Sequence, residues 1–161
     1  MRVGIGYDIH RLAEGRRLVL GGASFPGPVG LVGHSDADVV LHAVADAILG
    51  AGALGDLGDY FPDTSEQWRD ADSTVILEHV VKLAAGRGLA VANVDVNIIA
   101  ERPRIGPRRA EMCGNIARIL GVDVSRVSVK ARTAEGLGPV GQLQGIEVQA
   151  VVLLEEKAAP A

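Results

Sequence analysis

Apolar residues along the chain follow two different spacings, and each spacing predicts one kind of element. Apolar positions that repeat every three or four residues predict helices over residues 38–49, 73–85 and 107–120. Short apolar stretches, most of them alternating with polar residues, predict strands over residues 3–10, 17–20, 94–100, 127–131 and 146–154. Strands and helices in this mixed order predict an α/β domain of the α+β type, in which helices cover one mixed β-sheet.

Glycine and proline mark where these elements are expected to end. Gly50 and Gly52 fit the end of the first helix and Gly121 that of the third, because glycine tolerates the left-handed backbone that often follows a helix. Residues 55–69 are rich in Gly, Asp and Pro, which predicts an irregular loop.

Length and composition agree with one globular domain. The chain has 161 residues, 48% of them hydrophobic but only 3% aromatic, so Val, Ile, Leu and Ala must fill the core. No linker or repeat interrupts it, and we expect a single domain over residues 1–157 and a short tail over 158–161. The net charge is −4 and no basic stripe argues for a nucleic-acid surface, so an anionic substrate needs local positive groups or a metal ion.

Cysteine usage and targeting signals bear on the compartment. Cys113 is the only cysteine, which excludes an intramolecular disulfide and agrees with a reducing environment. No signal peptide and no apolar run of membrane-spanning length is visible. We therefore expect a cytoplasmic protein.

Two groups of polar residues have spacings that suit metal ligands. Asp8 and His10 share one face of the first strand, and Asp38, His42 and Asp46 share one face of the first helix. A catalytic zinc ion takes three ligands from His, Asp or Glu and keeps one position open, and Asp8, His10 and His42 could supply them. From spacing alone, unrelated polar surface residues are the better interpretation.

The segment before the first helix allows two interpretations. Ser35 or Asp38 could cap the helix with a side-chain oxygen. His34 and Ser35 could also contact a phosphate at the helix N-terminus, where backbone N–H groups are free. The chain has no dinucleotide fingerprint, P-loop or nucleophile elbow, which excludes these common motifs.

Two further polar clusters have both a structural and a functional interpretation. Asp56, Asp59 and Asp63 lie in the predicted loop, as a solvated turn or as a lid that holds substrate hydroxyls, and composition alone favours the turn. The segment from Lys130 to Glu135 ends a predicted strand. Glu135 is there either an ordinary rim residue or a ligand of Mg²⁺ together with substrate phosphates.

In chain order, these motifs resemble one family, the 2-C-methyl-D-erythritol 2,4-cyclodiphosphate synthases. The matching stretches are Gly4-x-Gly6-x-Asp8-x-His10, His34-Ser35-Asp36-Ala37-Asp38-x-x-x-His42-Ala43-x-x-Asp46-Ala47, Gly55-Asp56-Leu57-Gly58-x-x-Phe61-Pro62-Asp63, and the segments 100–106 and 130–135. The resemblance covers residues 2–155 approximately, and several motifs in the right order are more specific than any one of them.

The resemblance implies a role for each matching residue. Zinc would be held by Asp8, His10 and His42. The phosphates would contact His34 and Ser35. The methylerythritol part would be held by Asp56, Gly58 and Asp63, with Asp46 nearby. The cytosine and ribose would be framed by Ala100, Pro103, Arg104, Ala131, Arg132 and Thr133. A second divalent cation, Mg²⁺ or Mn²⁺, would bind Glu135 and the diphosphate, and Thr133 and Glu135 would join the zinc ligands in catalysis.

The resemblance also implies a reaction and an assembly. The substrate would be 4-diphosphocytidyl-2-C-methyl-D-erythritol 2-phosphate, whose 2-phosphate attacks the β-phosphate and expels CMP, in the non-mevalonate isoprenoid pathway. The family is similar in forming a homotrimer around a central, sheet-lined channel, with active sites between subunits. The alternatives are a zinc-dependent phosphate-ester hydrolase and a trimeric binding module without enzymatic activity.

The chain departs from the family pattern at a few positions. Ala37 replaces a common glycine, and we expect no cost unless the position needs a positive φ. Arg132 stands where threonine is common and Gly106 replaces a larger apolar residue, so base contacts would differ in detail. Gln142 stands where relatives often carry arginine facing the channel, which argues against an isoprenoid diphosphate ligand there.

Overall fold

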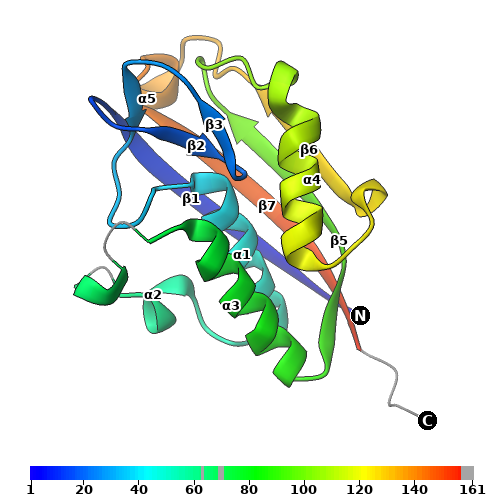
Figure 1. The fold of residues 1–161 in the computed structure, drawn as a ribbon. Coiled ribbons are helices and arrows are strands. Elements are labelled where there is room, and N and C mark those ends of the chain that lie inside the picture. Colours follow the sequence, from blue (N-terminus) through cyan, green and yellow to red (C-terminus); the bar gives the residue numbers. More distant parts are fainter. Residues whose placement is uncertain (63, 69–70, 157–161) are drawn as a thin grey trace.

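A computed structural model describes residues 1–62, 64–68 and 71–156 (Figure 1). The predicted tail over 158–161 lies outside these residues. The strands are β1 (Arg2–Glu14), β2 (Leu18–Leu20), β3 (Ala23–Phe25), β4 (Val29–Leu31), β5 (Leu89–Ile99), β6 (Val127–Arg132) and β7 (Gly145–Glu156). The α-helices are α1 (Val39–Gly52), α2 (Leu57–Tyr60), α3 (Ser73–Gly86), α4 (Arg109–Leu120) and α5 (Gly138–Gly141). The 3-10 helices are η1 (Glu66–Trp68), η2 (Gly106–Arg108) and η3 (Val124–Arg126).

One mixed sheet of five strands forms the centre of the domain, in the order β4-β1-β7-β5-β6. β1, β7 and β5 pair antiparallel, β6 runs parallel to β5, and β2 and β3 form a separate hairpin. The long helices α1, α3 and α4 lie on one face of the sheet (Figure 1). The predicted α+β domain with one mixed, helix-covered sheet is confirmed. Within the part of the chain that the structure describes, no helix is long and apolar enough to cross a membrane.

The predicted strands and long helices are all present, but some of their ends differ. β1 continues to Glu14, because it pairs first with β7 and then with β4. The prediction that Gly50 and Gly52 stop the first helix is wrong, because α1 includes both, and the left-handed residue that caps its end is Ala53, whose φ is 53°. A Cβ at Gly52 would lie 2.9 Å from the end of the Leu54 side chain, which would have to shift to admit it.

Periodicity gives no signal for the short elements. β3, β4 and α5 span only three or four residues each. The segment 55–69, which we predict to be an irregular loop, contains α2 and η1. α2 forms because Asp56 and Asp59 make a capping box, in which each carboxylate accepts the backbone N–H of the other residue. Local hydrogen bonds, not an apolar face, therefore define this element.

α1 packs directly on β1 at two glycines. A Cβ at Gly4 would lie 2.1 Å from the carbonyl oxygen of Ala47, and one at Gly6 would lie 1.9 Å from that of Ala43. Only glycine permits backbones to approach so closely. The same face of β1 continues with Asp8, so this contact brings polar residues of β1 beside α1.

Asp38 is the N-cap of α1 and is completely buried. Its carboxylate accepts two N–H groups from the first turn of α1, and two from Gly21 and Gly22 in the β2–β3 turn. Burial raises the pKa of this carboxyl, and the N–H donors oppose that shift. The surface interpretation is therefore wrong for Asp38. Of the two predicted capping residues, Asp38 has this role, whereas the Ser35 hydroxyl accepts the N–H of Ala37.

The other face of the sheet carries exposed apolar side chains. On β1 these are Val3, Ile5, Tyr7 and Ile9, and Ile5 is 72% exposed. Val151 of β7 is paired with Ile5 and is 44% exposed. Within a single chain, helices therefore cover only one side of the sheet.

Candidate metal centre and its pocket

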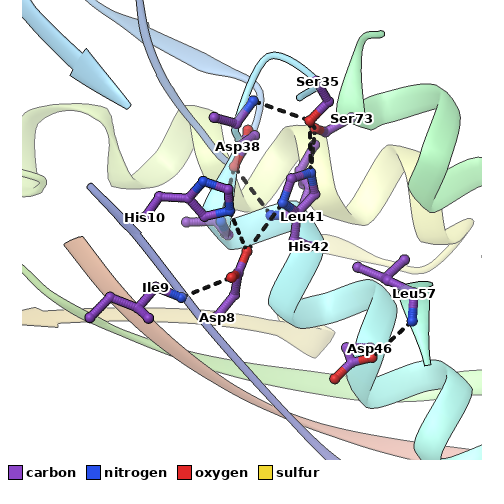
Figure 2. A network of polar contacts seen from close by, with 12 residues as sticks. Asp8, Ile9, His10, Ser35, Asp38, Leu41, His42, Asp46, Leu57 and Ser73 are labelled. Carbon is purple, nitrogen blue, oxygen red and sulfur yellow. Dashed lines mark hydrogen bonds and ion pairs between the residues drawn. The ribbon is translucent and has the colours of Figure 1, made fainter. Parts of the chain in front are cut away.

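Asp8 and His10 of β1 meet His42 of α1 beside the glycine contact (Figure 2). The Nε2 atom of His10 lies 2.9 Å from Oδ2 of Asp8, and Nδ1 of His42 lies 3.1 Å from the same oxygen. The three candidate ligand atoms are all within 4.8 Å of one another. Two imidazoles and one carboxylate match the donor set of a catalytic zinc site. The residues therefore fit a divalent metal ion.

In each histidine, the ring nitrogen that does not face Asp8 has a hydrogen-bond partner of its own. Nδ1 of His10 lies 2.8 Å from the carbonyl oxygen of Val32, to which it must donate. Nε2 of His42 lies 2.9 Å from Oγ of Ser73 and 3.2 Å from Oγ of Ser35. The two histidines thus turn different ring nitrogens, Nε2 and Nδ1, toward Asp8.

Electrostatics at the centre favour a charged Asp8–His10 pair. Burial alone would raise the pKa of Asp8, but its hydrogen bonds with His10 and His42 outweigh this and hold that pKa well below its usual range. Burial would lower the pKa of His10, but the hydrogen bond and the charge of Asp8 outweigh it and raise that pKa. Both nitrogens of His10 face acceptors, so a bound metal ion would take the place of the Nε2 proton.

A pocket of about 560 Å³ opens beside the centre. It brings together most of the predicted zinc, phosphate and methylerythritol residues, namely Asp8, His10, His34, Ser35, His42, Asp46, Asp56 and Gly58. The predicted residue Asp63 lies outside the described residues. Among the described residues that line the pocket there is no Lys or Arg. An anionic ligand would therefore depend on a metal ion or on cations from elsewhere.

Asp46 connects α1 to the wall of the pocket. Its Oδ1 atom accepts the N–H of Leu57 at 3.3 Å, which places the start of α2 beside the centre. Burial raises the pKa of Asp46, the N–H of Leu57 opposes this, and the charges of Asp56 and Asp8 add to the rise.

Aromatic residues of the pocket were missing from the predicted site. Phe61 and Trp68 line it and pack edge to face, with ring centroids 4.8 Å apart. Trp68 is the only tryptophan of the chain. The one signal in the sequence that could have placed Trp68 in the site is its position in a polar segment, because a large apolar ring there needs a surface to contact.

The predicted nucleotide residues form a second cluster, where β5 and β6 end. The N–H of Ala100 donates to the carbonyl of Arg132 at 3.0 Å. One carboxylate oxygen of Glu101 accepts the N–H groups of Ala134 and Gly136, which joins the two segments. Of the predicted residues, Ala100, Ala131, Arg132, Thr133 and Glu135 lie in these joined segments, and Pro103 and Arg104 follow Glu101 in the chain. None of these residues lines the pocket beside Asp8.

Side-chain hydrogen bonds fix Thr133 and Arg132 in the second cluster. The Thr133 hydroxyl donates to the Glu135 carboxylate at 2.7 Å, and Nε of Arg132 donates to Oδ1 of Asn97. Pro103 follows a cis peptide bond. It lines a separate pocket of about 480 Å³ together with Arg104.

Ala37 meets the condition under which a cost was expected. Its φ is 60°, so the position does need a positive φ, and the alanine here carries a cost that glycine would avoid. Left-handed backbone costs an L-residue about 1–2 kcal/mol. The strained residue separates Ser35, on the pocket, from the buried cap Asp38, so the strain lies in the turn that orients both.

The fold and the pocket define an α+β protein with a candidate divalent-metal centre. The model of the YgbB family matches residues 1–155, and this chain belongs to that family. A relative from Chlorobium phaeobacteroides, named 2-C-methyl-D-erythritol 2,4-cyclodiphosphate synthase, is 52% identical over 157 residues, which are 98% of this chain and 99% of the relative.

Solved structures agree with this assignment. A 2C-methyl-D-erythritol-2,4-cyclodiphosphate synthase in a CDP-bound form is 39% identical, with a TM-score of 0.88 over 96% of this chain and 100% of that one. An IspF–CDP complex from Plasmodium falciparum is 36% identical, with a TM-score of 0.86 over 98% of this chain and 97% of that one. The similarity thus extends over the whole domain.

Proposed function

We propose that this protein converts 4-diphosphocytidyl-2-C-methyl-D-erythritol 2-phosphate into 2-C-methyl-D-erythritol 2,4-cyclodiphosphate and CMP, in the non-mevalonate pathway. The observation that carries the proposal is the convergence of Asp8, His10 and His42 in a pocket, in a chain that is 52% identical to a named synthase over nearly its full length.

The chemistry of the reaction explains why this pocket needs a metal ion. An oxygen of the 2-phosphate attacks the β-phosphorus, and the bond from that phosphorus to the bridging oxygen of CMP breaks, with its electrons leaving on CMP. Both reacting groups are anions, and the pocket adds the carboxylates of Asp8, Asp46 and Asp56. A zinc ion on Asp8, His10 and His42 would supply a Lewis acid that draws charge from a phosphate oxygen.

The remaining residues of the pocket bind and orient the substrate in this proposal. His34 and Ser35 contact the phosphate groups. Asp46, Asp56, Gly58 and, outside the described residues, Asp63 hold the methylerythritol part through its hydroxyl groups. Such positioning supplies much of the rate of a phosphoryl transfer, and no protein nucleophile is required.

The second cluster binds the nucleotide in this proposal. Ala100, Pro103, Arg104, Ala131, Arg132 and Thr133 frame cytosine and ribose, and Glu135 holds Mg²⁺ or Mn²⁺ against the diphosphate. The cluster is absent from the lining of the metal pocket, so a complete site would combine the pocket of one chain with the cluster of a neighbour. The exposed apolar face of the sheet supports a homotrimer in which three such faces enclose a central channel.

Phosphorus NMR with the cytidyl substrate and Mg²⁺, before and after removal of zinc, tests the proposal. We expect a cyclic diphosphate and an equal amount of CMP, and we expect both to disappear on chelation and in His42→Ala. Inorganic phosphate or a linear product from the zinc-loaded protein would instead establish a hydrolase. No turnover by protein with full zinc content would contradict any catalytic role on this substrate.

A further inference from the structure

The outer side of His42 carries a hydrogen-bond chain that leads away from the pocket. Ser73, the first residue of α3, is completely buried, and its Oγ atom lies 2.9 Å from Nε2 of His42 (Figure 2). The same hydroxyl donates to the carboxylate of Asp36. Asp36 and Ser73 are 37 positions apart, so the chain depends on α3 docking against the turn before α1.

The direction of this chain follows from its donors. Asp36 is surrounded by donors, because its carboxylate also accepts the backbone N–H groups of Ser73 and Asp38. A serine hydroxyl has one proton, and here that proton goes to Asp36. Oγ of Ser73 can then only accept from Nε2–H of His42. Nε2 therefore keeps its proton, and a metal ion beside Asp8 would replace the proton that Nδ1 shares with the Asp8 carboxylate.

The neighbouring hydroxyl of Ser35 is a weaker partner for the same nitrogen. Its Oγ lies 3.2 Å from Nε2, compared with 2.9 Å for Ser73, and it already accepts the N–H of Ala37. Nothing comparable to Asp36 fixes its proton among the described contacts. Ser73 therefore gives Nε2 of His42 its better acceptor.

We propose that Ser73 and Asp36 are positioning residues that hold His42 in the tautomer and orientation needed to bind metal through Nδ1. They act on His42 as the carbonyl of Val32 acts on His10. Partners of this kind behind metal-binding histidines usually change metal affinity by about 10- to 100-fold. The inference rests on the metal centre of the proposed function, not on the reaction.

Zinc titration of metal-free protein against a chelating dye tests this with Ser73→Ala. We expect zinc binding to weaken by about 10- to 100-fold. Ser125→Ala is the matched control, because the Ser125 hydroxyl donates to the Asp123 carboxylate at 2.6 Å at the start of η3. We expect that variant to bind zinc like the wild type. Equal affinity of Ser73→Ala and the wild type would overturn the inference.

A second readout separates positioning from simple support of the fold. In zinc-bound protein labelled with ¹⁵N-histidine, we expect protected ring N–H signals from His42 Nε2 and His10 Nδ1. Ser73→Ala should lose protection at His42 only, with His10 as the internal control. Retained protection at His42 would contradict the proposed chain.

Two further comparisons keep the test decisive. If Ser73→Ala does not fold, Asp36→Ala leaves the hydroxyl but frees its proton to turn toward His42, and we expect zinc affinity to fall about tenfold. Unchanged affinity in Asp36→Ala would then overturn the inference. If the wild type itself binds no zinc, the metal centre of the proposed function fails, which is a different result from equal binding by wild type and variant.

Discussion

At the scale of single residues, the candidate centre balances burial against close charge partners. Asp8 and His10 are both partly buried, which disfavours charge, yet each stabilises the charge of the other. A metal ion competes with a proton for Nε2 of His10. As pH rises, the stability that comes from the protonated His10 should therefore decrease, and the stability that comes from a bound metal ion should increase.

The stability of the metal-free protein should reflect the raised pKa of His10. The contribution of this pair is complete below the usual histidine value of about 6.5 and is lost as pH rises through the higher folded pKa. The lowered pKa of Asp8 acts in the opposite sense: its contribution is complete above the usual aspartate pKa and is lost as pH falls from there through the lower folded pKa.

Chemical denaturation of the metal-free protein between pH 6 and 9, approximately, measures this effect. We expect the stability difference between wild type and His10→Gln to shrink as pH rises, while the extra stability from added zinc grows because metal binding requires a neutral imidazole. A wild-type advantage that stays constant over this range would contradict the assigned charge pair.

Glu135 makes a separate residue-scale prediction. Its carboxylate accepts from the Thr133 hydroxyl, away from the pocket of Asp8. We expect Glu135→Gln to need about tenfold more Mg²⁺ for half-maximal turnover, equivalent to about 1.4 kcal/mol of binding, with its zinc content unchanged. Glu111→Gln, which changes an exposed carboxylate on α4, is the control. An unchanged Mg²⁺ dependence in Glu135→Gln would remove Glu135 from the second metal site.

At the scale of elements, the contact between β1 and α1 decides where the centre forms. Gly4 and Gly6 let the helix backbone touch the strand, and Asp8 and His10 continue the same face of β1. His42 lies one residue before Ala43, whose carbonyl oxygen faces Gly6. The glycine contact therefore sets the distance between the ligands of the two elements.

Gly6→Ala should disrupt this contact. The new Cβ would lie 1.9 Å from the carbonyl oxygen of Ala43, which the backbone must move to avoid, so we expect a loss of about 3 kcal/mol or more in the free energy of unfolding. Zinc affinity should fall with it.

Gly114→Ala is the opposite case and the control for Gly6→Ala. Gly114 lies in α4, and a Cβ there meets no atom within 4 Å. We expect this variant to gain up to about 1 kcal/mol, because alanine favours helix more than glycine does. Urea denaturation measures both variants, and similar stabilities would contradict the packing argument.

At the scale of the whole molecule, the features that matter are the two clusters and the open face of the sheet. The metal pocket and the predicted nucleotide residues are separate in one chain. The apolar side chains of Ile5 and Val151 are exposed on the face without helices. Assembly through that face would bury them and would allow neighbouring chains to complete each other's sites.

Ile5→Glu should prevent this assembly without unfolding the chain, because the side chain points away from the core of the chain. We expect light scattering to show the mass of one chain, zinc binding to remain, and cyclisation to fall at least about 100-fold because substrate groups are no longer held together. Val75→Glu, on the exposed side of α3, should remain assembled and active. Full activity of a monomeric Ile5→Glu protein would contradict sites shared between chains.

Elements with a local signal could be predicted from the amino-acid sequence. A helix or strand with one apolar face shows its period in consecutive residues, so the long helices and the main strands were predictable. Asp8, His10 and His42 were candidates by spacing and became specific only through the order of several motifs. The cost of Ala37 depended on whether its φ is positive, and residue type alone does not give the sign of φ.

Features that depend on contacts between distant segments became visible only in the folded chain. The burial of Asp38 follows from the β2–β3 turn, and the support of His42 by Ser73 and Asp36 follows from the docking of α3. The place of Trp68 on the pocket and the separation of the two clusters are likewise long-range results. The periodicity of apolar residues indicates which face of its own helix or strand a side chain lies on. It does not indicate which residue of another element that side chain contacts.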